Sequence, residues 1–397
     1  MPGFELFGDL ERKELNDVLE NGVLMRYGFD GMRNGHWKAK ELEAEIESRF
    51  DIKHAQLTSS GTTALNVALA VMGIGSGDEV IMPTFTFVAS FESILAAGAI
   101  PVLVEIDDTL TLDPAAVEKA ITAKTKAVMP VHMCGSMADL DALQDICKRH
   151  NLYLLEDACQ AFGAKYKGKK VGTIGDAGTF SFDFVKTLTC GEGGVMMTNN
   201  DDFAVWADQY TDHGHDHVGN DRGAESHPIL GYNFRISELH AAVGLAQIRR
   251  MDDFIAIQRR NHSILKQALS QIPEVSFRRV PDPEGDSCGF LNFFMPTADL
   301  TAKVVEAFKE HGIDSYWNYY ANNWHYVRRW EHLKNAKSLF PIADEVRERI
   351  EDIKNQKFPQ SDDYMSRNIS CLIKLSWEED QVKDLGQRMA KAIRSIL

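Results

Sequence analysis

Glu79-Val80-Ile81-Met82-Pro83 is the first of four short apolar runs that alternate with amphipathic segments between residues 62 and 156. The runs have the length of buried strands, and the segments between them have the apolar spacing of helices. Strands and helices that alternate in this way predict an α/β fold with a largely parallel sheet covered by helices. The other expected strands are 101–105, 126–131 and 152–156, and the expected helices are 62–72, 87–97, 114–121 and 139–150.

A long helical pattern begins at Ser237 and continues past Arg250. Beyond it the regular alternation is lost, although short strand-like segments still occur among helices. A chain of 397 residues is too long for one small core. We therefore expect this helix to connect a large domain, residues 1–250, to a smaller C-terminal α+β domain, residues 251–397.

The composition is that of an ordinary globular protein, with 44% hydrophobic and 25% charged residues. The formal net charge of -15 argues against nucleic acid as a partner, because a negative field repels the phosphate backbone. Six scattered cysteines match neither a zinc site nor a disulfide framework, which favours reduced thiols. The start of the chain lacks signal-peptide features and no apolar run reaches membrane-spanning length. We expect a cytoplasmic protein with no membrane contact.

Lys186 lies between aromatic residues and a glycine-rich turn, in the run FSFDFVKTLTCGEGG over residues 180–194. Shielding from water favours the neutral, nucleophilic amine, which can form an imine with the aldehyde of pyridoxal phosphate. Asp157 lies 29 residues upstream, at the end of the apolar run 152–156. A carboxylate there could pair with a protonated pyridine nitrogen. Lys186 and Asp157 are therefore the candidate catalytic residues.

A turn rich in glycine and hydroxyl groups, residues 59–65, opens the first expected helix. Helix N-termini expose unpaired N–H groups and a partial positive charge, so Gly61 and Thr62 could hold a phosphate. The alternative is an ordinary cap that serves only its own helix. Ser181, on the strand leading to Lys186, could add a second hydroxyl to the same phosphate.

Two further residues complete the candidate cofactor site. Phe87 could stack on a flat ring, although a lone aromatic residue is more often part of the core. Gln160, one helical turn beyond Asp157, could hydrogen-bond a ring hydroxyl. Ligands of open α/β sheets bind beyond the carboxyl ends of the strands, and that placement suits every one of these residues. The set is therefore more specific than any of its members.

Five segments occur in an order that resembles the DegT/DnrJ/StrS family of sugar aminotransferases, which has the fold type I architecture of aspartate aminotransferase. They are 59–65, 83–90, 156–161, 186–194 and 231–237. The resemblance covers nearly the whole chain. It implies pyridoxal phosphate as cofactor, with the roles just described for Lys186, Asp157, Gln160, Gly61, Thr62, Ser181 and Phe87. It also implies that Asn233 reaches the phosphate of a partner subunit, so that the active sites lie at a homodimer interface.

Most of the family acts on nucleotide-linked keto-sugars, but four segments look closer to a branch that aminates an unlinked sugar acid. They are 25–30, 212–217, 221–228 and 323–326. Arg26, Arg222 and Arg235 are candidates for the sugar carboxylate, because guanidinium binds carboxylate with two hydrogen bonds. His215 and His325 are candidate sugar contacts. The alternatives are ion pairs for the arginines, loop contacts for His215 and core packing for His325.

Other functions are less consistent with the sequence. His213, His215 and His217 alternate as some metal ligands do, but glycines at 214 and 219 suggest a loop, and polar contacts are favoured over a metal. The related sugar dehydratases have histidine where this chain has Lys186. Residues 73–78 do not match the Gly-x-Gly-x-x-Gly of nicotinamide dehydrogenases. The expected enzyme is an aminotransferase that takes its amino group from glutamate, and a non-catalytic cofactor-binding protein is the remaining alternative.

Overall fold

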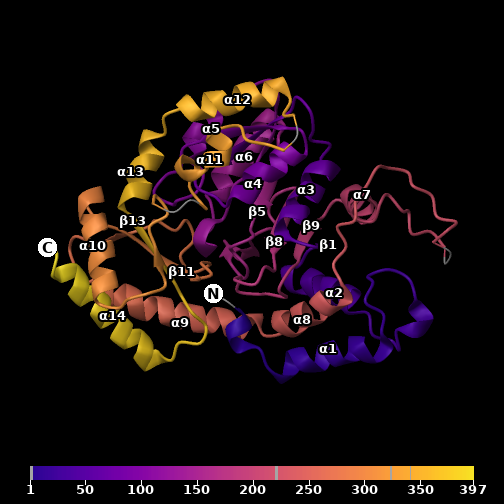
Figure 1. The fold of residues 1–397 in the computed structure, drawn as a ribbon, viewed down its shortest axis with the longest axis horizontal. Helices are drawn as coiled ribbons and strands as arrows, with labels where there is room; N and C mark the ends of the chain where they lie inside the picture. The colour runs from indigo at the N-terminus through magenta and orange to yellow at the C-terminus, as the bar shows by residue number, and fades with distance from the viewer. Residues whose placement is uncertain (1–2, 220–221, 322–323, 340) are drawn as a thin grey trace.

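The computed structural model describes residues 3–219, 222–321, 324–339 and 341–397, which form two main β-sheets with helices packed around them (Figure 1). Two of the segments that indicated the sugar-acid branch include Asp221 and Asn323, which lie outside the described residues. The same is true of Met1 and Pro2, at the start of the chain.

Seven strands form the large sheet in the order β1-β9-β8-β5-β4-β2-β3. Six of them run in one direction, and β9 is antiparallel to both of its neighbours. The four expected strands are confirmed as β2 to β5, and the mostly parallel sheet is confirmed with them. The strands are β1 (His54–Thr58), β2 (Glu79–Pro83), β3 (Ile100–Val104), β4 (Thr125–Val128), β5 (Tyr153–Asp157), β8 (Ala177–Ser181) and β9 (Gly194–Thr198).

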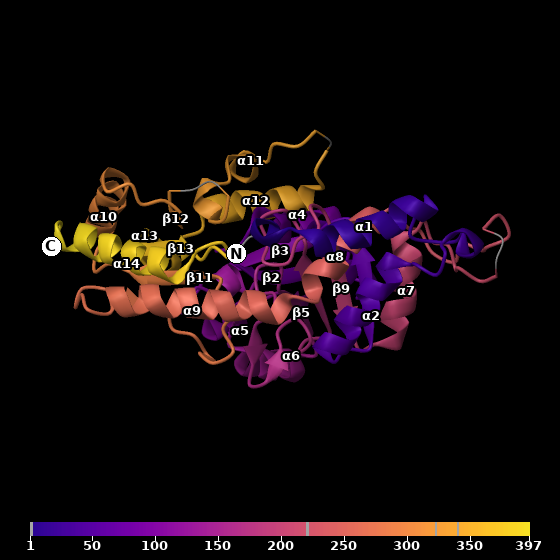
Figure 2. The same cartoon turned by 90° about the horizontal axis from the view of Figure 1, so that it is seen from below.

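Helices cover both faces of the large sheet, because two separate apolar clusters each join strand residues to a different set of helices. One cluster contains α3 (Gly61–Val71), α4 (Val88–Ala96), α7 (Asp201–Thr211) and α12 (Asp344–Asn355). The other contains α2 (Lys38–Phe50), α5 (Pro114–Ala120), α6 (Leu140–His150) and α8 (Glu238–Ile248). Figure 2 shows α12 and α6 on opposite sides of the sheet. The four expected helices are confirmed as α3 to α6.

The helix expected from Ser237 past Arg250 is two helices, α8 and α9 (Met251–Leu269), so the prediction of one continuous helix is wrong. Arg250 leaves the helical region, with φ −105° and ψ 6°. The two arginines at the break bind carboxylates of α1 (Asp9–Asn21): Arg249 Nη1 lies 2.8 Å from Glu14 Oε1, and Arg250 Nη1 lies 3.1 Å from Glu11 Oε1. These contacts with a distant helix accompany the break, which no proline or glycine at the junction signals.

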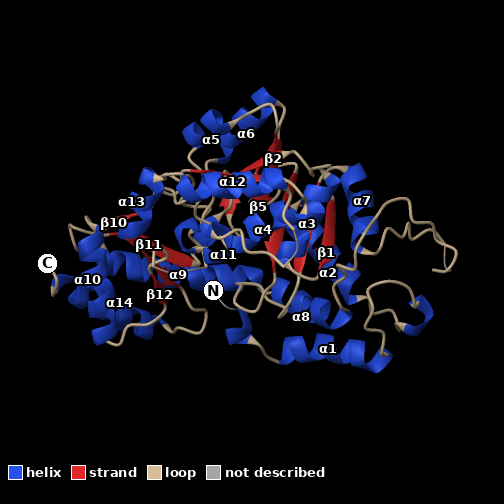
Figure 3. Ribbon diagram, turned by 45° about the horizontal axis from the view of Figure 1, so that its top comes forward, coloured by secondary structure: helices blue, strands red, loops and turns tan. Residues whose placement is uncertain are grey.

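A smaller, antiparallel sheet has the order β10-β11-β13-β12 and packs with α9, α10 and α14 around a third apolar cluster. Figure 3 shows its strands to the left of the large sheet. In the sequence, all strands of the large sheet come before residue 250 and all strands of the small sheet come after it. Helix α12 also comes after residue 250 but packs on the large sheet, so the domain division stays a prediction. The elements are β10 (Ser276–Phe277), β11 (Phe290–Phe294), α10 (Ala298–Glu310), β12 (Tyr316–Trp317), α11 (Glu331–Lys334), α13 (Pro359–Arg367), β13 (Asn368–Leu372) and α14 (Glu379–Arg394).

A two-stranded hairpin of β6 (Lys165–Tyr166) and β7 (Lys169–Lys170), together with short 3-10 turns, completes the described elements. The 3-10 turn η3 (Met133–Gly135) follows β4 and lies between the two sheets, where its residues contact β11. None of the helices in the described ranges is both long and apolar enough to cross a membrane.

Candidate active site

A cavity of about 250 Å³ lies at the carboxyl ends of β5 and β8, beside the N-terminus of α3. This is the edge of the sheet at which an open α/β fold binds its ligands. The predicted residues that line the cavity are Gly61, Thr62, Phe87, Asp157, Gln160, Ser181, Lys186 and His325. The fold therefore brings together eight residues that are spread over more than 260 positions of the sequence.

The N-terminus of α3 combines an ordinary cap with free donors. Ser60 caps the helix, because its Oγ accepts a hydrogen bond of 3.1 Å from the N–H of Thr63. Among the described residues, none accepts a hydrogen bond from the N–H groups of Gly61 and Thr62. A Cβ atom on Gly61 would lie 2.6 Å from Cβ of Ser181, so the helix can approach β8 this closely only with glycine. The two free N–H groups provide the anion-binding geometry of a helix N-terminus.

Asp157 is the last residue of β5, and its side chain is 4% exposed. Its Oδ2 accepts a hydrogen bond of 2.6 Å from Ser90 Oγ, and its Oδ1 accepts one of 3.2 Å from the N–H of Cys159. In the described part of the chain, no cationic side chain forms an ion pair with this carboxylate. A buried carboxylate without a cation is costly, so the site fits a ligand that brings a positive charge, such as a protonated pyridine nitrogen.

Gln160 is fixed by its amide oxygen, which accepts a hydrogen bond of 3.0 Å from the N–H of Cys134. The amide nitrogen is then the group left to donate to a ligand in the cavity. Phe87 is the N-cap residue of α4, and its ring centroid lies 5.5 Å from that of His325. Two aromatic rings from distant parts of the chain therefore form one side of the cavity.

Lys186 ends a tight turn after β8, in which its N–H donates to the carbonyl of Asp183 at 3.0 Å. Phe182, before the turn, is fully buried. Phe184, within the turn, is 50% exposed and stacks on Phe4 with ring centroids 4.2 Å apart. Of the three phenylalanines that precede the lysine in this run, Phe180 and Phe182 are core residues, whereas Phe184 is half-exposed. The turn places the side chain of Lys186 in the cavity wall.

His325 contributes a neutral imidazole to the cavity. Burial, and then the nearby positive charge of Lys186, lower the pKa of His325 to about 3. Its Nδ1 is buried and has no hydrogen-bond partner among the described residues. Its backbone carbonyl accepts a hydrogen bond of 2.9 Å from the N–H of Thr86, which ties this segment to the strand end beside Phe87.

The other five predicted residues lie outside this cavity. Arg26 is buried, and its Nη2 lies 2.6 Å from Glu43 Oε1. The remaining four lie on the segment 212–235. Arg222 Nη2 is 2.8 Å from Asp212 Oδ1, and Arg235 forms an ion pair with the same carboxylate. His215 Nδ1 is 2.8 Å from Glu225 Oε2. Asn233 is exposed, and its Oδ1 accepts a hydrogen bond of 3.4 Å from the N–H of Arg235. None of the five lines the cofactor cavity of its own chain.

Asp212 is the centre of the charge cluster on this segment. It is fully buried and binds the guanidinium groups of Arg222 and Arg235, while His217 Nε2 lies 3.0 Å from its Oδ2. Burial disfavours charge on His217, but hydrogen bonds with Asp208 and Asp212 outweigh burial and raise the pKa of His217 to about 9. In the described ranges, no group of three His, Cys, Asp or Glu side chains is arranged to hold a metal ion.

The cavity has what pyridoxal phosphate needs: free N–H donors for a phosphate, a buried carboxylate without a cation, and a lysine. Together with a sheet in which only β9 is reversed, these features define a pyridoxal phosphate-dependent enzyme of fold type I. The chain belongs to the DegT/DnrJ/EryC1/StrS aminotransferase family, which it matches over residues 8–354. It is a sugar aminotransferase that uses pyridoxal phosphate.

Relatives with assigned activities agree with this family. The chain is 42% identical over 261 residues to GDP-perosamine synthase of Caulobacter vibrioides, covering 66% of this chain and 68% of the relative. It is also 42% identical over 265 residues to L-glutamine:2-deoxy-scyllo-inosose aminotransferase of Streptoalloteichus tenebrarius, covering 65% and 62% of the two chains. The crystal structure of 3-amino-5-hydroxybenzoic acid synthase superimposes with a TM-score of 0.81 at 31% identity, covering 98% of this chain and 97% of that one.

Two groups that shape the site were not predicted from the sequence. Ser90 and Thr86 form a buried hydroxyl pair, with oxygens 2.6 Å apart, behind Asp157. Both lie in the segment 83–90 that carried the family resemblance, where only Phe87 received a role. Cys134 fixes Gln160 through its backbone N–H, which no residue-type pattern would reveal.

Proposed function

We propose that the protein transfers an amino group from glutamate to the 8-oxo form of 3,8-dideoxy-D-manno-octulosonate. The product would be the 8-amino sugar acid, for incorporation into lipopolysaccharide. We further propose that the active unit is a homodimer in the cytoplasm.

The residues around the cavity would divide the chemistry among them. When bound, pyridoxal phosphate supplies an aldehyde that takes up the amino group and a ring that withdraws electrons from the reacting carbon. Asp157, oriented by Ser90, would hold a proton on the ring nitrogen. The N–H groups of Gly61 and Thr62 would bind the phosphate.

Lys186 would have two roles, as covalent anchor and as acid and base. Its Nζ would take a proton from the α-carbon of the amino donor and, in the second half of the cycle, deliver one to the former carbonyl carbon of the sugar. Gln160 Nε2 would donate to the ring oxygen, and Phe87 would cover one face of the ring. The apolar wall around Lys186 would exclude water from these steps.

The observation that carries the choice of acceptor is the position of the segment that contains Trp324 and His325. This segment helped to indicate the sugar-acid branch, and both of these residues line the cavity next to Lys186. His325 presents a neutral ring whose Nδ1 lacks a partner in the described structure, which suits a hydrogen bond with a sugar hydroxyl.

A homodimer would explain why Asn233, His215 and Arg222 do not reach the cavity of their own chain. Figure 1 shows that the chain after α7 extends away from the rest of the molecule. Such an extension could carry these residues to the cavity of a second subunit, as the family resemblance implies for Asn233. The guanidinium of Arg222 is partly exposed and would then be available to a sugar carboxylate.

A second candidate acceptor is a nucleotide-linked keto-sugar. The similarity to GDP-perosamine synthase favours it, and the name of the S. tenebrarius relative raises L-glutamine as an alternative amino donor. A sugar dehydratase is the third and least favoured candidate, because the related dehydratases have histidine at the position that Lys186 occupies in this chain.

A direct comparison of acceptors tests the proposal. The 8-oxo sugar acid and keto-sugars linked to UDP, GDP and dTDP would each be incubated with the purified protein, with glutamate and glutamine in separate arms. We expect turnover of the free acid, with loss of turnover when its carboxylate is converted to an amide. Preference for a nucleotide-linked acceptor would overturn the choice of sugar and leave the aminotransferase in place. Release of a deoxygenated sugar without an amine would instead indicate a dehydratase.

A further inference from the structure

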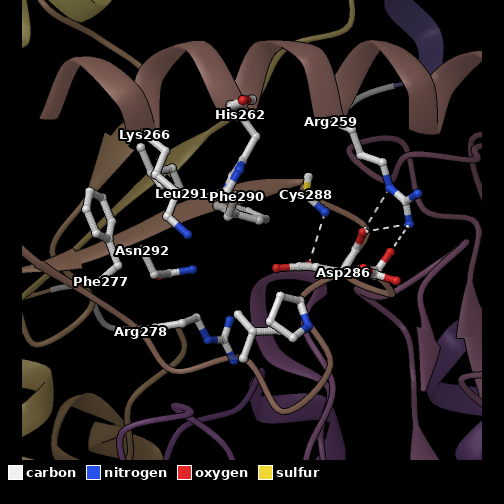
Figure 4. Close-up of a pocket in the computed structure, with 14 residues that line it drawn as sticks. Arg259, His262, Lys266, Phe277, Arg278, Asp286, Cys288, Phe290, Leu291 and Asn292 are labelled. Atoms are coloured by element: carbon white, nitrogen blue, oxygen red, sulfur yellow. Dashed lines mark hydrogen bonds between the residues drawn. The ribbon is translucent and has the colours of Figure 1, made fainter. Parts of the chain in front are cut away.

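A second cavity, of about 450 Å³, lies between α9 and β11. Figure 4 shows Lys266 and His262 reaching toward it from α9, Asn292 extending into it from β11, and Arg278 on the side opposite the helix. Phe277 and Phe290 provide apolar surface in the same wall. None of the residues that line this cavity lines the cofactor cavity.

Arg278 is a buried cation that has no counter-ion in the described part of the chain. Its side chain is 7% exposed, and its guanidinium donates only to backbone carbonyls, with Nε 2.8 Å from Thr109 O and Nη1 2.8 Å from Met133 O. Within the described residues, no carboxylate lies at ion-pair distance from it. A buried charge is costly unless an opposite charge or further hydrogen bonds compensate for it, and arginine does not lose its proton in proteins.

Asn292 adds an unused donor beside this cation. Its side chain is 3% exposed, and its Oδ1 accepts a hydrogen bond of 2.5 Å from Ser370 Oγ. Its Nδ2 is buried and finds no acceptor among the described residues. An unsatisfied buried donor next to an uncompensated cation is the arrangement that an oxyanion would satisfy.

The charged side chains in the wall give the cavity a net positive charge, because three cations, Arg259, Lys266 and Arg278, outnumber the carboxylates of Glu284 and Asp286. Lys266 has no carboxylate partner in the described part of the chain, and its Nζ lies 5.4 Å from the centroid of the Phe277 ring. Arg259 donates to the backbone carbonyls of Glu284 and Asp286. The carboxylate of Asp286 is occupied by neutral donors, the N–H of Cys288 at 3.0 Å and Ser136 Oγ at 2.9 Å.

We propose that this cavity binds a small metabolite through an oxyanion group, either a carboxylate or a phosphate. Arg278 and Lys266 neutralise its charge, and Asn292 Nδ2 donates a hydrogen bond to it. The carbon skeleton of the ligand packs against Phe277 and Phe290. The volume of the cavity is in the range that holds a small molecule.

The new site is connected to the cofactor cavity through the backbone of the turn η3. Arg278 binds the carbonyl of Met133, and the N–H of the next residue, Cys134, holds the amide oxygen of Gln160. The turn η3 therefore carries contacts with Arg278 in one cavity and with Gln160 in the other. A ligand bound to Arg278 would therefore contact a side chain that is anchored at Met133. The next residue, Cys134, is the one whose N–H positions Gln160.

Isothermal titration calorimetry of the holoenzyme with inorganic phosphate and, separately, with malonate tests the proposal. We expect saturable binding at one site, and the probe that binds more tightly identifies the preferred anion. Substitution of Arg278 would also remove its ties to Thr109 and Met133, so the exposed Lys266 is the better position to change. Lys266→Gln should weaken binding at least about tenfold, the effect of losing one charged contact.

Two further variants make the result decisive. Lys303→Gln removes an exposed lysine on α10, outside the cavity, and should leave binding unchanged. Asn292→Asp keeps the shape of the side chain but adds a negative charge, and should abolish binding. The proposal is overturned if neither probe binds saturably, or if either binds Lys266→Gln or Asn292→Asp as tightly as the unmodified protein.

Discussion

Ser90 Oγ donates a hydrogen bond of 2.6 Å to Asp157 Oδ2, although the two residues are 67 positions apart in the sequence. Both are buried, and the bond joins the first turn of α4 to the end of β5. A carboxylate held in this way keeps one orientation relative to the cavity. Ser90 is thus a positioning residue that acts through Asp157.

We expect Ser90→Ala to lower kcat by about 10- to 100-fold, since a hydrogen bond to a charged group contributes about 1.5–3 kcal/mol. Asp157→Asn should have a larger effect, because a neutral partner no longer stabilises a protonated ring nitrogen. Ser93→Ala is a matched control on the same helix, since Ser93 is also buried but donates to the carbonyl of Ser90. The measurements are kcat and the absorption spectrum of the bound cofactor. Equal losses in Ser90→Ala and Ser93→Ala would mean that only packing was disturbed.

Gly61→Ala should reduce cofactor affinity, because its Cβ would meet Cβ of Ser181 at 2.6 Å and push the start of α3 away from β8. The free N–H groups would then no longer face the bound phosphate. We expect at least about a tenfold higher Kd for pyridoxal phosphate, measured by fluorescence titration of the apoprotein. Gly31→Ala is the control, because a Cβ there meets nothing within 4 Å. An unchanged Kd in Gly61→Ala would exclude this helix end as the phosphate site.

His217 should make the stability of the protein depend on pH. Its pKa is raised from 6.5 to about 9 in the folded state, so folding favours the protonated ring. This contribution is complete below pH 6.5 and is lost as the pH rises through about 9. The difference in unfolding free energy between the unmodified protein and His217→Gln should therefore fall over that range by roughly 1–2 kcal/mol, after screening at the partly exposed Asp208. Urea unfolding at several pH values measures it, and a constant difference would contradict this role.

Hybrid dimers test whether active sites are shared between subunits. We expect Lys186→Ala and Asn233→Asp proteins each to be nearly inactive alone, the second because a carboxylate repels the cofactor phosphate. In a mixed dimer, one active site would have both substitutions and the other would have neither. A hybrid dimer should therefore have up to about half of the activity of the unmodified dimer. Analytical ultracentrifugation would confirm the dimer. No recovery in verified hybrids would place Asn233 at the site of its own chain.

The parts of the fold that sequence predicted well are those in which local patterns carry the information. The strands β2 to β5 lie within short, mostly apolar runs, and helix α5 begins where Asp113 caps it and Pro114 opens it. The end of β5 shows how side-chain alternation separates two adjacent carboxylates. Glu156 is buried on one face, where it accepts hydrogen bonds from the N–H groups of the loop 172–175, whereas Asp157 faces the cavity.

What sequence could not predict depends on contacts between distant segments. The break between α8 and α9 coincides with ion pairs to α1, more than 230 residues earlier. The family resemblance made His325 a candidate. Its position beside Phe87, however, depends on the chain returning to the large sheet after strand β12 of the small sheet. The second cavity is formed by residues that have no shared motif, and only the fold shows that Arg278 has no counter-ion among the described residues.

Borohydride reduction of the purified holoenzyme, followed by peptide mass spectrometry, shows which lysine carries the cofactor. We expect the cofactor to be attached to the peptide that contains Lys186, and the yellow absorption band to disappear when glutamate is added before reduction. Lys186→Ala should carry no covalent cofactor and should lose nearly all turnover. Attachment to a different lysine, or undiminished turnover in Lys186→Ala, would rule out Lys186 as the residue that carries the cofactor.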